Sequence, residues 1–176
     1  MSGPGFKPMS YDQHIRSAKD IVARCAVVTL SDTRTRETDT SGQLILKLLA
    51  EAGHQVSRYH LIKDDREALA SLLLDLASDG EIDVLLTNGG TGIANRDQTI
   101  DVVETMIDQP LPGFGELFRM LSWQQVGAGA MLSRATAGIT RGKPIFSMPG
   151  SSKAVELAMT QLILPQVRHI LHELRK

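Results

Sequence analysis

The sequence of 176 residues contains a single cysteine, so an internal disulfide is excluded and a metal site built from thiolates is disfavoured. That cysteine, Cys25, opens an apolar run, and we expect it to pack in the core rather than act as a nucleophile. No apolar run approaches the ~20 residues of a membrane-spanning helix, and residues 1–20 lack the apolar centre of a signal peptide. We therefore expect a cytoplasmic protein that has no membrane partner.

An excess of either charge is absent as well. The 19 lysine and arginine residues nearly balance the 20 aspartate and glutamate residues, and the net charge of −1 argues against nucleic acid as a partner. With 42% apolar and 22% charged residues, the composition is typical of a globular protein, and the length suits one domain. We expect a flexible arm over residues 1–20 and a single α/β domain over residues 21–176.

Strand patterns and helical patterns alternate along the chain. Strands are predicted at residues 24–31, 56–62, 84–86, 135–139 and 144–148. Apolar residues with helical spacing follow each of the first three strands, which predicts parallel pairing and helices on both faces of the sheet. The predicted fold class is therefore a doubly wound three-layer α/β/α sandwich with a mainly parallel central sheet. Pro165 predicts a break or restart in the last helix.

The segment over residues 114–123 places large apolar side chains on more than one face of a helix. These side chains are Phe114, Leu117, Phe118, Met120, Leu121 and Trp123. Packing on the core would account for them, and so would a subunit interface. We predict that part of this segment joins copies of the chain in a homo-oligomer.

Three glycines in four positions directly follow the third predicted strand. The turn reads Gly89, Gly90, Thr91 and Gly92, and Arg96, Asp97 and Thr99 come before the next helix. Glycine tolerates positive φ and lets a ligand approach the backbone closely. A strand, a glycine turn and a helix start are the layout of a phosphate or nucleotide site at the carboxyl edge of a parallel sheet. The turn matches neither a Walker loop nor a dinucleotide fingerprint, and glycines that serve only the turn geometry remain an alternative.

A second turn favours an anion as well. It lies where the last predicted strand gives way to a helix, and it reads Pro149, Gly150, Ser151, Ser152 and Lys153. A lysine near a helix N-terminus opposes the helix dipole, so its presence favours an anion between them. Two such turns predict a ligand with more than one anionic group.

Carboxylates follow the predicted strands at the same edge of the sheet. Asp97 could cap the helix that follows it, and Asp64 or Asp65 could cap the helix before the glycine turn. Carboxylates beside a phosphate are costly unless a cation such as Mg²⁺ joins them. Metal-assisted phosphoryl or nucleotidyl transfer is the chemistry that needs this combination. The polar loop over residues 31–42 is long enough to indicate either a function or disorder.

Several spaced motifs resemble the molybdopterin-binding family of molybdenum cofactor biosynthesis. They are Thr-Asn-Gly-Gly-Thr-Gly (87–92), Arg-Asp-Gln-Thr (96–99), Pro-Gly-Phe-Gly-Glu (112–116), Leu-Ser-Arg-Ala (132–135) and Met-Pro-Gly-Ser (148–151). The resemblance implies a doubly wound fold in a trimer or hexamer, with other molybdenum cofactor biosynthesis proteins as further partners. It also implies adenylylation of molybdopterin with Mg-ATP, which yields adenylyl-molybdopterin and pyrophosphate.

The resemblance assigns roles residue by residue. Asp64 and Asp97 are predicted as the catalytic residues and as ligands of Mg²⁺. The residues predicted to bind the substrates are Asp39, Ser41, Gly42, Thr87, Gly89, Gly90, Thr91, Gly92, Arg96, Thr99, Ser133, Arg134, Pro149, Gly150, Ser151 and Lys153. Two alternatives stay open. A protein of the same fold could bind or hand on molybdopterin without turnover, or a scaffold could use the glycines only for geometry.

Overall fold

The computed structural model describes residues 18–95 and 97–176, so most of the predicted arm over residues 1–20 lies outside the described residues. The strands are β1 (Arg24–Leu30), β2 (Gln55–Ile62), β3 (Val84–Asn88), β4 (Gln109–Pro110), β5 (Thr136–Thr140) and β6 (Lys143–Met148). The helices are α2 (Thr40–Glu51), α3 (Arg66–Ser78), α4 (Thr99–Met106), α5 (Pro112–Val126), α6 (Ser152–Leu157) and α7 (Leu164–Leu174). A 3₁₀ helix η1 (Gly127–Leu132) follows α5, and a π-helical turn η2 (Ala158–Ile163) joins α6 to α7.

The strands form one sheet in the order β2-β1-β3-β6-β5-β4. Strand β1 pairs in parallel with β2 and β3, and β3 pairs in parallel with β6. Strand β5 runs antiparallel to both β6 and β4, and a turn with positive φ at Arg141 and Gly142 closes the β5–β6 hairpin. The predicted mainly parallel sheet is therefore confirmed, with an antiparallel edge.

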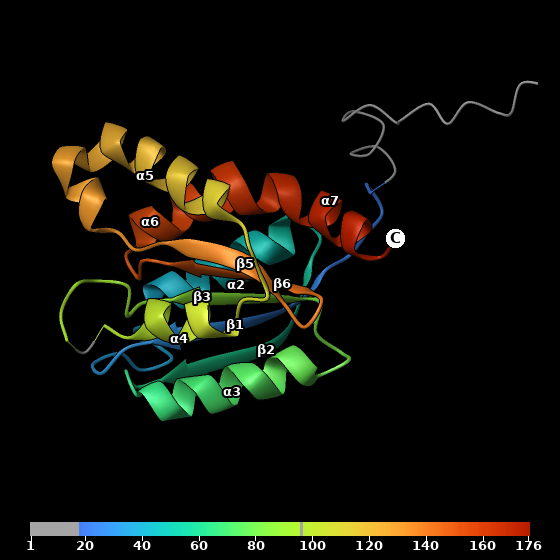
Figure 1. Cartoon of the computed structure of the whole chain (residues 1–176), viewed down its shortest axis with the longest axis horizontal. Coiled ribbons are helices and arrows are strands. Elements are labelled where there is room, and N and C mark those ends of the chain that lie inside the picture. The colour runs from blue at the N-terminus through green and yellow to red at the C-terminus, as the bar shows by residue number, and fades with distance from the viewer. Residues whose placement is uncertain (1–17, 96) are drawn as a thin grey trace, which may run out of the picture.

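Helices cover both faces of this sheet, which gives the three predicted layers (Figure 1). Helices α2, α5, α6 and α7 lie on one face, where the larger apolar cluster includes Ile45, Phe118 and Val167. Helices α3 and α4 lie on the other face, where Leu73 and Val103 pack on the sheet. Both clusters include apolar residues of the central strands β1, β3 and β6, whose two faces are buried.

The core thiol behaves as predicted. Cys25 is free and fully buried in β1, and burial raises the pKa of its thiol to about 12. Such a thiol stays protonated and is a packing residue. Among the helices of residues 18–95 and 97–176, none is long and apolar enough to cross a bilayer.

Helix α5 corrects part of the predicted interface segment. Phe114 and Phe118 are buried, with ring centroids 6.3 Å apart, and the ring of Phe114 also meets Phe146 edge-on. These two side chains belong to the core because they point at the sheet. Leu117, Met120 and Trp123 are exposed, as are Val126 at the end of α5 and Met131 and Leu132 of η1.

Candidate functional site

A cleft of about 580 Å³ opens at the carboxyl ends of the parallel strands. The predicted site residues that line it are Asp64, Gly89, Gly90, Thr91, Gly92, Asp97, Ser133, Pro149, Gly150 and Ser151. Its other lining residues, which were not predicted as site residues, are Leu30, Ser31, Asp32, Thr33, Arg34, Gly129 and Leu132. The two predicted anion-binding turns therefore face one cleft, and the polar loop before α2 completes it.

The two glycine turns pack backbone against backbone. Gly89 has a φ of +98°, and a Cβ atom there would collide with the carbonyl oxygen of Leu30. A Cβ atom on Gly150 would lie 3.1 Å from the Cα of Gly89. Larger residues would push the turns apart, so the glycines keep both backbones at the cleft.

Behind the first turn lie two side chains that the sequence assigned to the site. A Cβ atom on Gly90, where φ is +60°, would lie 2.5 Å from Asp64 Oδ1 and would also meet Thr99 Oγ1. Thr99 is buried, and its hydroxyl has no hydrogen-bond partner within the described residues. The hydroxyl of Ser133, which lines the cleft, is likewise buried without a partner there. The hydroxyl of Ser133 in the cleft wall therefore suits a site that a polar ligand completes, whereas Thr99 is not among the residues that line the cleft.

The capping alternative is wrong for Asp97. Helix α4 has Gln98 at its N-cap position without a side-chain hydrogen bond, and Asp97 Oδ2 instead accepts from the backbone N of Ala94 at 3.0 Å. Helix α3 is capped by Asp65, which accepts from Ala68 N at 2.8 Å. The cap of α3 is therefore not Asp64, and both predicted catalytic carboxylates line the cleft.

Asp39 and Ser41 lie behind the cleft instead of lining it. Both are fully buried at the start of α2, where Asp39 Oδ1 accepts from Gly42 N at 3.0 Å. A Cβ atom on Gly42 would overlap the Asp39 carboxylate, which explains the glycine. Burial opposes ionisation of Asp39, yet hydrogen bonds from Thr29, Tyr59, Gly42 and Ser41 outweigh it and lower its pKa. Asp39 and Ser41 are thus absent from the described lining of the cleft, and their contact with substrate stays a prediction.

Arg34 is the positively charged residue among the cleft-lining residues that were not predicted from the sequence. Its Nη1 donates to Asp39 Oδ1 at 3.2 Å and to Ser41 Oγ, and its Nη2 donates to the carbonyl oxygen of Gly150 at 2.9 Å. The guanidinium therefore ties the polar loop to the second glycine turn. The length of that loop was the available signal, but nothing in the sequence pairs it with a residue so far along the chain.

Arg134 holds the first glycine turn from outside the cleft. Its Nε donates to Gly92 O at 2.9 Å, its Nη1 donates to Asp101 Oδ1 at 3.0 Å, and its Nη2 donates to Asp97 O. It lines two hollows beside the cleft. Its contacts therefore brace the loop that carries Gly92 and Asp97 against α4.

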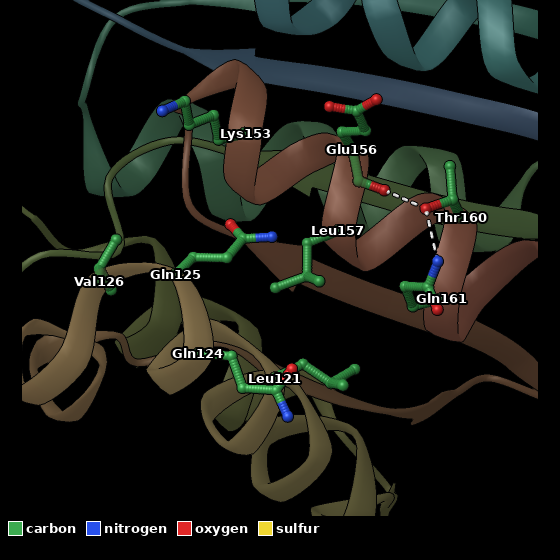
Figure 2. A pocket seen from close by; sticks show the side chains of 9 residues that line it. All are labelled: Leu121, Gln124, Gln125, Val126, Lys153, Glu156, Leu157, Thr160 and Gln161. Carbon is green, nitrogen blue, oxygen red and sulfur yellow. Dashed lines mark hydrogen bonds between the residues drawn. The ribbon is translucent and has the colours of Figure 1, made fainter.

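Two further predicted residues, Thr87 and Lys153, lie away from the described lining of the cleft. Thr87 is buried in β3 and donates to Ser147 Oγ at 2.7 Å. Lys153 lies at the edge of a separate hollow of about 550 Å³ between α5 and α6, shared with Gln125 and Glu156 (Figure 2). Arg96 lies outside the described residues. The anion-binding role predicted for Lys153 at the second turn therefore has no support from its position.

The charge of the cleft bears on its ligand. Asp32, Asp64 and Asp97 line it, whereas Arg34 is the single cation among its described lining residues. Within the part of the chain that the structure describes, three or more His, Cys, Asp or Glu side chains nowhere gather into a metal site. One or two carboxylates suffice for Mg²⁺ when substrate phosphates supply the other ligands. The donors present therefore fit a magnesium ion that arrives with a phosphate ligand.

Known proteins are similar to this chain in sequence and in fold. Residues 26–169 match the family described as "Probable molybdopterin binding domain". Over 169 residues the chain is 50% identical to molybdenum cofactor biosynthesis protein B of Bacillus subtilis (strain 168), an alignment that covers 96% of this chain and 99% of that protein. A crystal structure of molybdenum cofactor biosynthesis protein B has a TM-score of 0.86 at 53% identity and covers 88% of this chain and 97% of that one. The tungsten cofactor synthesizing protein MoaB from Pyrococcus furiosus has a TM-score of 0.77 at 37% identity, over 88% of this chain and 98% of its own.

Proposed function

The chain belongs to the molybdopterin-binding family of molybdenum cofactor biosynthesis, and on that premise we propose that it adenylylates molybdopterin with Mg-ATP. In this reaction an oxygen of the terminal phosphate of molybdopterin attacks the α-phosphorus of ATP. The bond between the α-phosphorus and the bridging oxygen breaks, and pyrophosphate leaves with that oxygen. The products are adenylyl-molybdopterin and pyrophosphate.

One observation carries the proposal: two glycine turns and two carboxylates, Asp64 and Asp97, meet in one cleft. The backbone N–H groups of such turns suit phosphate groups, and the carboxylates suit the cation that accompanies a polyphosphate. Magnesium, when bound there with ATP, would neutralise charge that develops on the departing pyrophosphate. Asp64 and Asp97 are the residues that would hold it.

A binding protein of the same family is the second candidate. The hydroxyl of Ser133, which has no described partner, and the glycine turns would serve a ligand equally well without turnover. What favours the enzyme is the excess of carboxylate in the cleft, because carboxylates repel a phosphate ligand unless a cation is part of the complex. A carrier of an anionic pterin has no need of that arrangement.

Product analysis tests the proposal. The protein is incubated with molybdopterin, ATP and MgCl₂, and the mixture is analysed for adenylyl-molybdopterin and for pyrophosphate. We expect both products in equal amounts, and neither when ATP or Mg²⁺ is left out. Tight binding of molybdopterin without either product would establish the carrier instead.

A further inference from the structure

The guanidinium of Arg34 is held in place and still has donors to offer. Arginine carries five N–H donors. Three of them are used, by Asp39, Ser41 and the carbonyl of Gly150. No acceptor among residues 18–95 and 97–176 meets its Nε–H, and its side chain is 30% exposed at the wall of the cleft. Because these hydrogen bonds already fix the guanidinium, it can bind a ligand at the cleft without giving up its present contacts.

The orientation comes from a buried network. Tyr59 Oη of β2 donates to Asp39 Oδ2 at 2.6 Å. The single hydroxyl proton of Ser41 has two acceptors within reach, Asp39 Oδ1 at 3.0 Å and Asn88 Oδ1 of β3 at 2.8 Å. Asp39 is fully buried, so its carboxylate cannot swing away from the guanidinium. Strands β2 and β3 and the start of α2 thus all fix the position of one arginine.

We propose that Arg34 binds a phosphate group of the substrate directly and that Asp39 is the positioning residue that aims its guanidinium. The planar fork of arginine matches two oxygens of a phosphate. Arg34 lines the cleft and donates to the carbonyl oxygen of Gly150 in the second glycine turn. The other charged residues described in the cleft wall are carboxylates, which repel an anion. The inference rests on the proposed function, because that function supplies two phosphate ligands, ATP and molybdopterin.

Calorimetry on the full chain tests Arg34 and distinguishes the two sources of phosphate. Mg-ATP and molybdopterin are titrated separately into wild type, Arg34→Gln and Arg34→Lys. We expect one of the two ligands to bind about 10- to 100-fold more weakly to Arg34→Gln, the range for losing hydrogen bonds to a charged group. Arg34→Lys keeps the charge but not the fork, so its affinity should fall between. Arg58→Gln is the matched control, since Arg58 is a half-exposed arginine that pairs with Asp79 outside the cleft.

A double-variant cycle tests Asp39. If Asp39 acts through Arg34, Asp39→Asn should lower the affinity for the same ligand. The double variant, which carries both Arg34→Gln and Asp39→Asn, should then bind that ligand no more weakly than Arg34→Gln alone. If Asp39 has only a structural role, Asp39→Asn should lower the melting temperature, and its loss of affinity should add to the loss caused by Arg34→Gln. Additive losses would overturn the positioning role.

The outcomes separate this inference from the proposed function. Binding is measured without turnover, so a wild type that binds but makes no adenylyl-molybdopterin removes the enzymatic proposal and leaves Arg34 testable. Affinities of folded Arg34→Gln within about twofold of wild type for both ligands would overturn the inference alone. A wild type that binds neither ligand would overturn both.

Discussion

Asp97 and Asp64 offer a test that separates charge from shape. Asparagine keeps the volume and one acceptor oxygen of aspartate but removes the charge that would hold Mg²⁺. We predict that adenylylation falls by at least ~100-fold in Asp97→Asn and in Asp64→Asn, the scale for losing one preorganised electrostatic contact. Affinity for molybdopterin, measured by calorimetry, should change little, because its contacts are expected mainly from the loops.

Asp65 supplies the matched control. Its carboxylate caps α3 through Ala68 N, and asparagine caps about as well as aspartate. Asp65→Asn should therefore keep the turnover and melting temperature of the wild type. Full activity in both Asp97→Asn and Asp64→Asn would reject their catalytic assignment.

Gly92 tests whether the position of Asp97 matters. A Cβ atom there would lie 2.5 Å from Asp97 Oδ2, so the carboxylate must move, and Gly92 is not among the glycines with positive φ. We expect Gly92→Ala to lose roughly 10- to 100-fold in turnover, as misplacement of a catalytic group does, with little change in melting temperature. Gly80→Ala is the control, because a Cβ atom there meets nothing within 4 Å. Unchanged turnover in Gly92→Ala would mean that the enzyme tolerates a displaced Asp97.

At the scale of elements, Arg134 joins the loop after β3 to α4. We predict that Arg134→Gln lowers turnover more than affinity for molybdopterin, because it frees the loop that carries Gly92 and Asp97. Asp101→Asn should act in the same direction but more weakly, since the bonds from Arg134 to the two carbonyls remain. Steady-state kinetics and calorimetry on the same samples compare the two effects. A loss of affinity larger than the loss of turnover would support the direct ligand contact that the sequence resemblance implied for Arg134.

Local chemistry explains which elements could be predicted. The strand, the glycine turn and the helix are each determined by residues close together in the sequence, so β3 and the turn at Gly89 could be inferred from it. The restart at Pro165 is confirmed, since α7 begins at Leu164, but the π-helical turn η2 before it has no sequence signal. Strand β4 was missed because it spans two residues, one of them Pro110, and exists only through its pairing with β5.

The same reasoning applies to the site. Asp64 lies just after β2, and Asp97 lies in the loop that joins β3 to α4. The topology of a parallel sheet brings the loops at the carboxyl ends of its strands together. Arg34 could not be found in this way, because its contact with Gly150 spans 116 residues and starts from a polar loop without a regular pattern. The sequence shows Asp39 two residues before Ser41, and only the structure shows that both accept hydrogen bonds from Arg34.

At the scale of the whole molecule, the exposed part of α5 predicts assembly. Leu117, Met120 and Trp123 are 47%, 56% and 61% exposed, and large apolar side chains exposed at a spacing of three on one helix are typical of an interaction surface. We predict a homo-oligomer, a trimer by family resemblance, that dissociates in a Met120→Lys, Trp123→Lys double variant. Light scattering at micromolar concentration measures the mass. Leu74→Lys, on the opposite face of the sheet, is the control and should leave the oligomer intact. A monomeric wild type would refute the prediction.

The stability of the whole chain should also depend on the protonation of His54, which lies between α2 and β2. His54 is 6% exposed, and its Nδ1 accepts from the backbone N of Ala23 at 3.1 Å. Burial, together with the charge of Arg168, lowers its pKa from the ordinary value of 6.5. The folded protein thus resists a proton that the unfolded chain accepts. Stability from this group is complete above pH 6.5 and falls as the pH drops below it, by at most about 1.4 kcal/mol per pH unit.

Urea unfolding between pH 8 and pH 5 measures this effect. In His54→Asn, the side-chain oxygen can still accept from Ala23 N, but the side chain no longer titrates. We expect this variant to show a shallower loss of stability than the wild type below pH 6.5. Burial also lowers the pKa of His60, which therefore contributes to the pH dependence in the same direction. His60→Gln is measured alongside to separate the contributions of the two histidines to the loss of stability. Identical pH slopes in wild type and His54→Asn would show that His54 accepts a proton in the folded chain as readily as in the unfolded one.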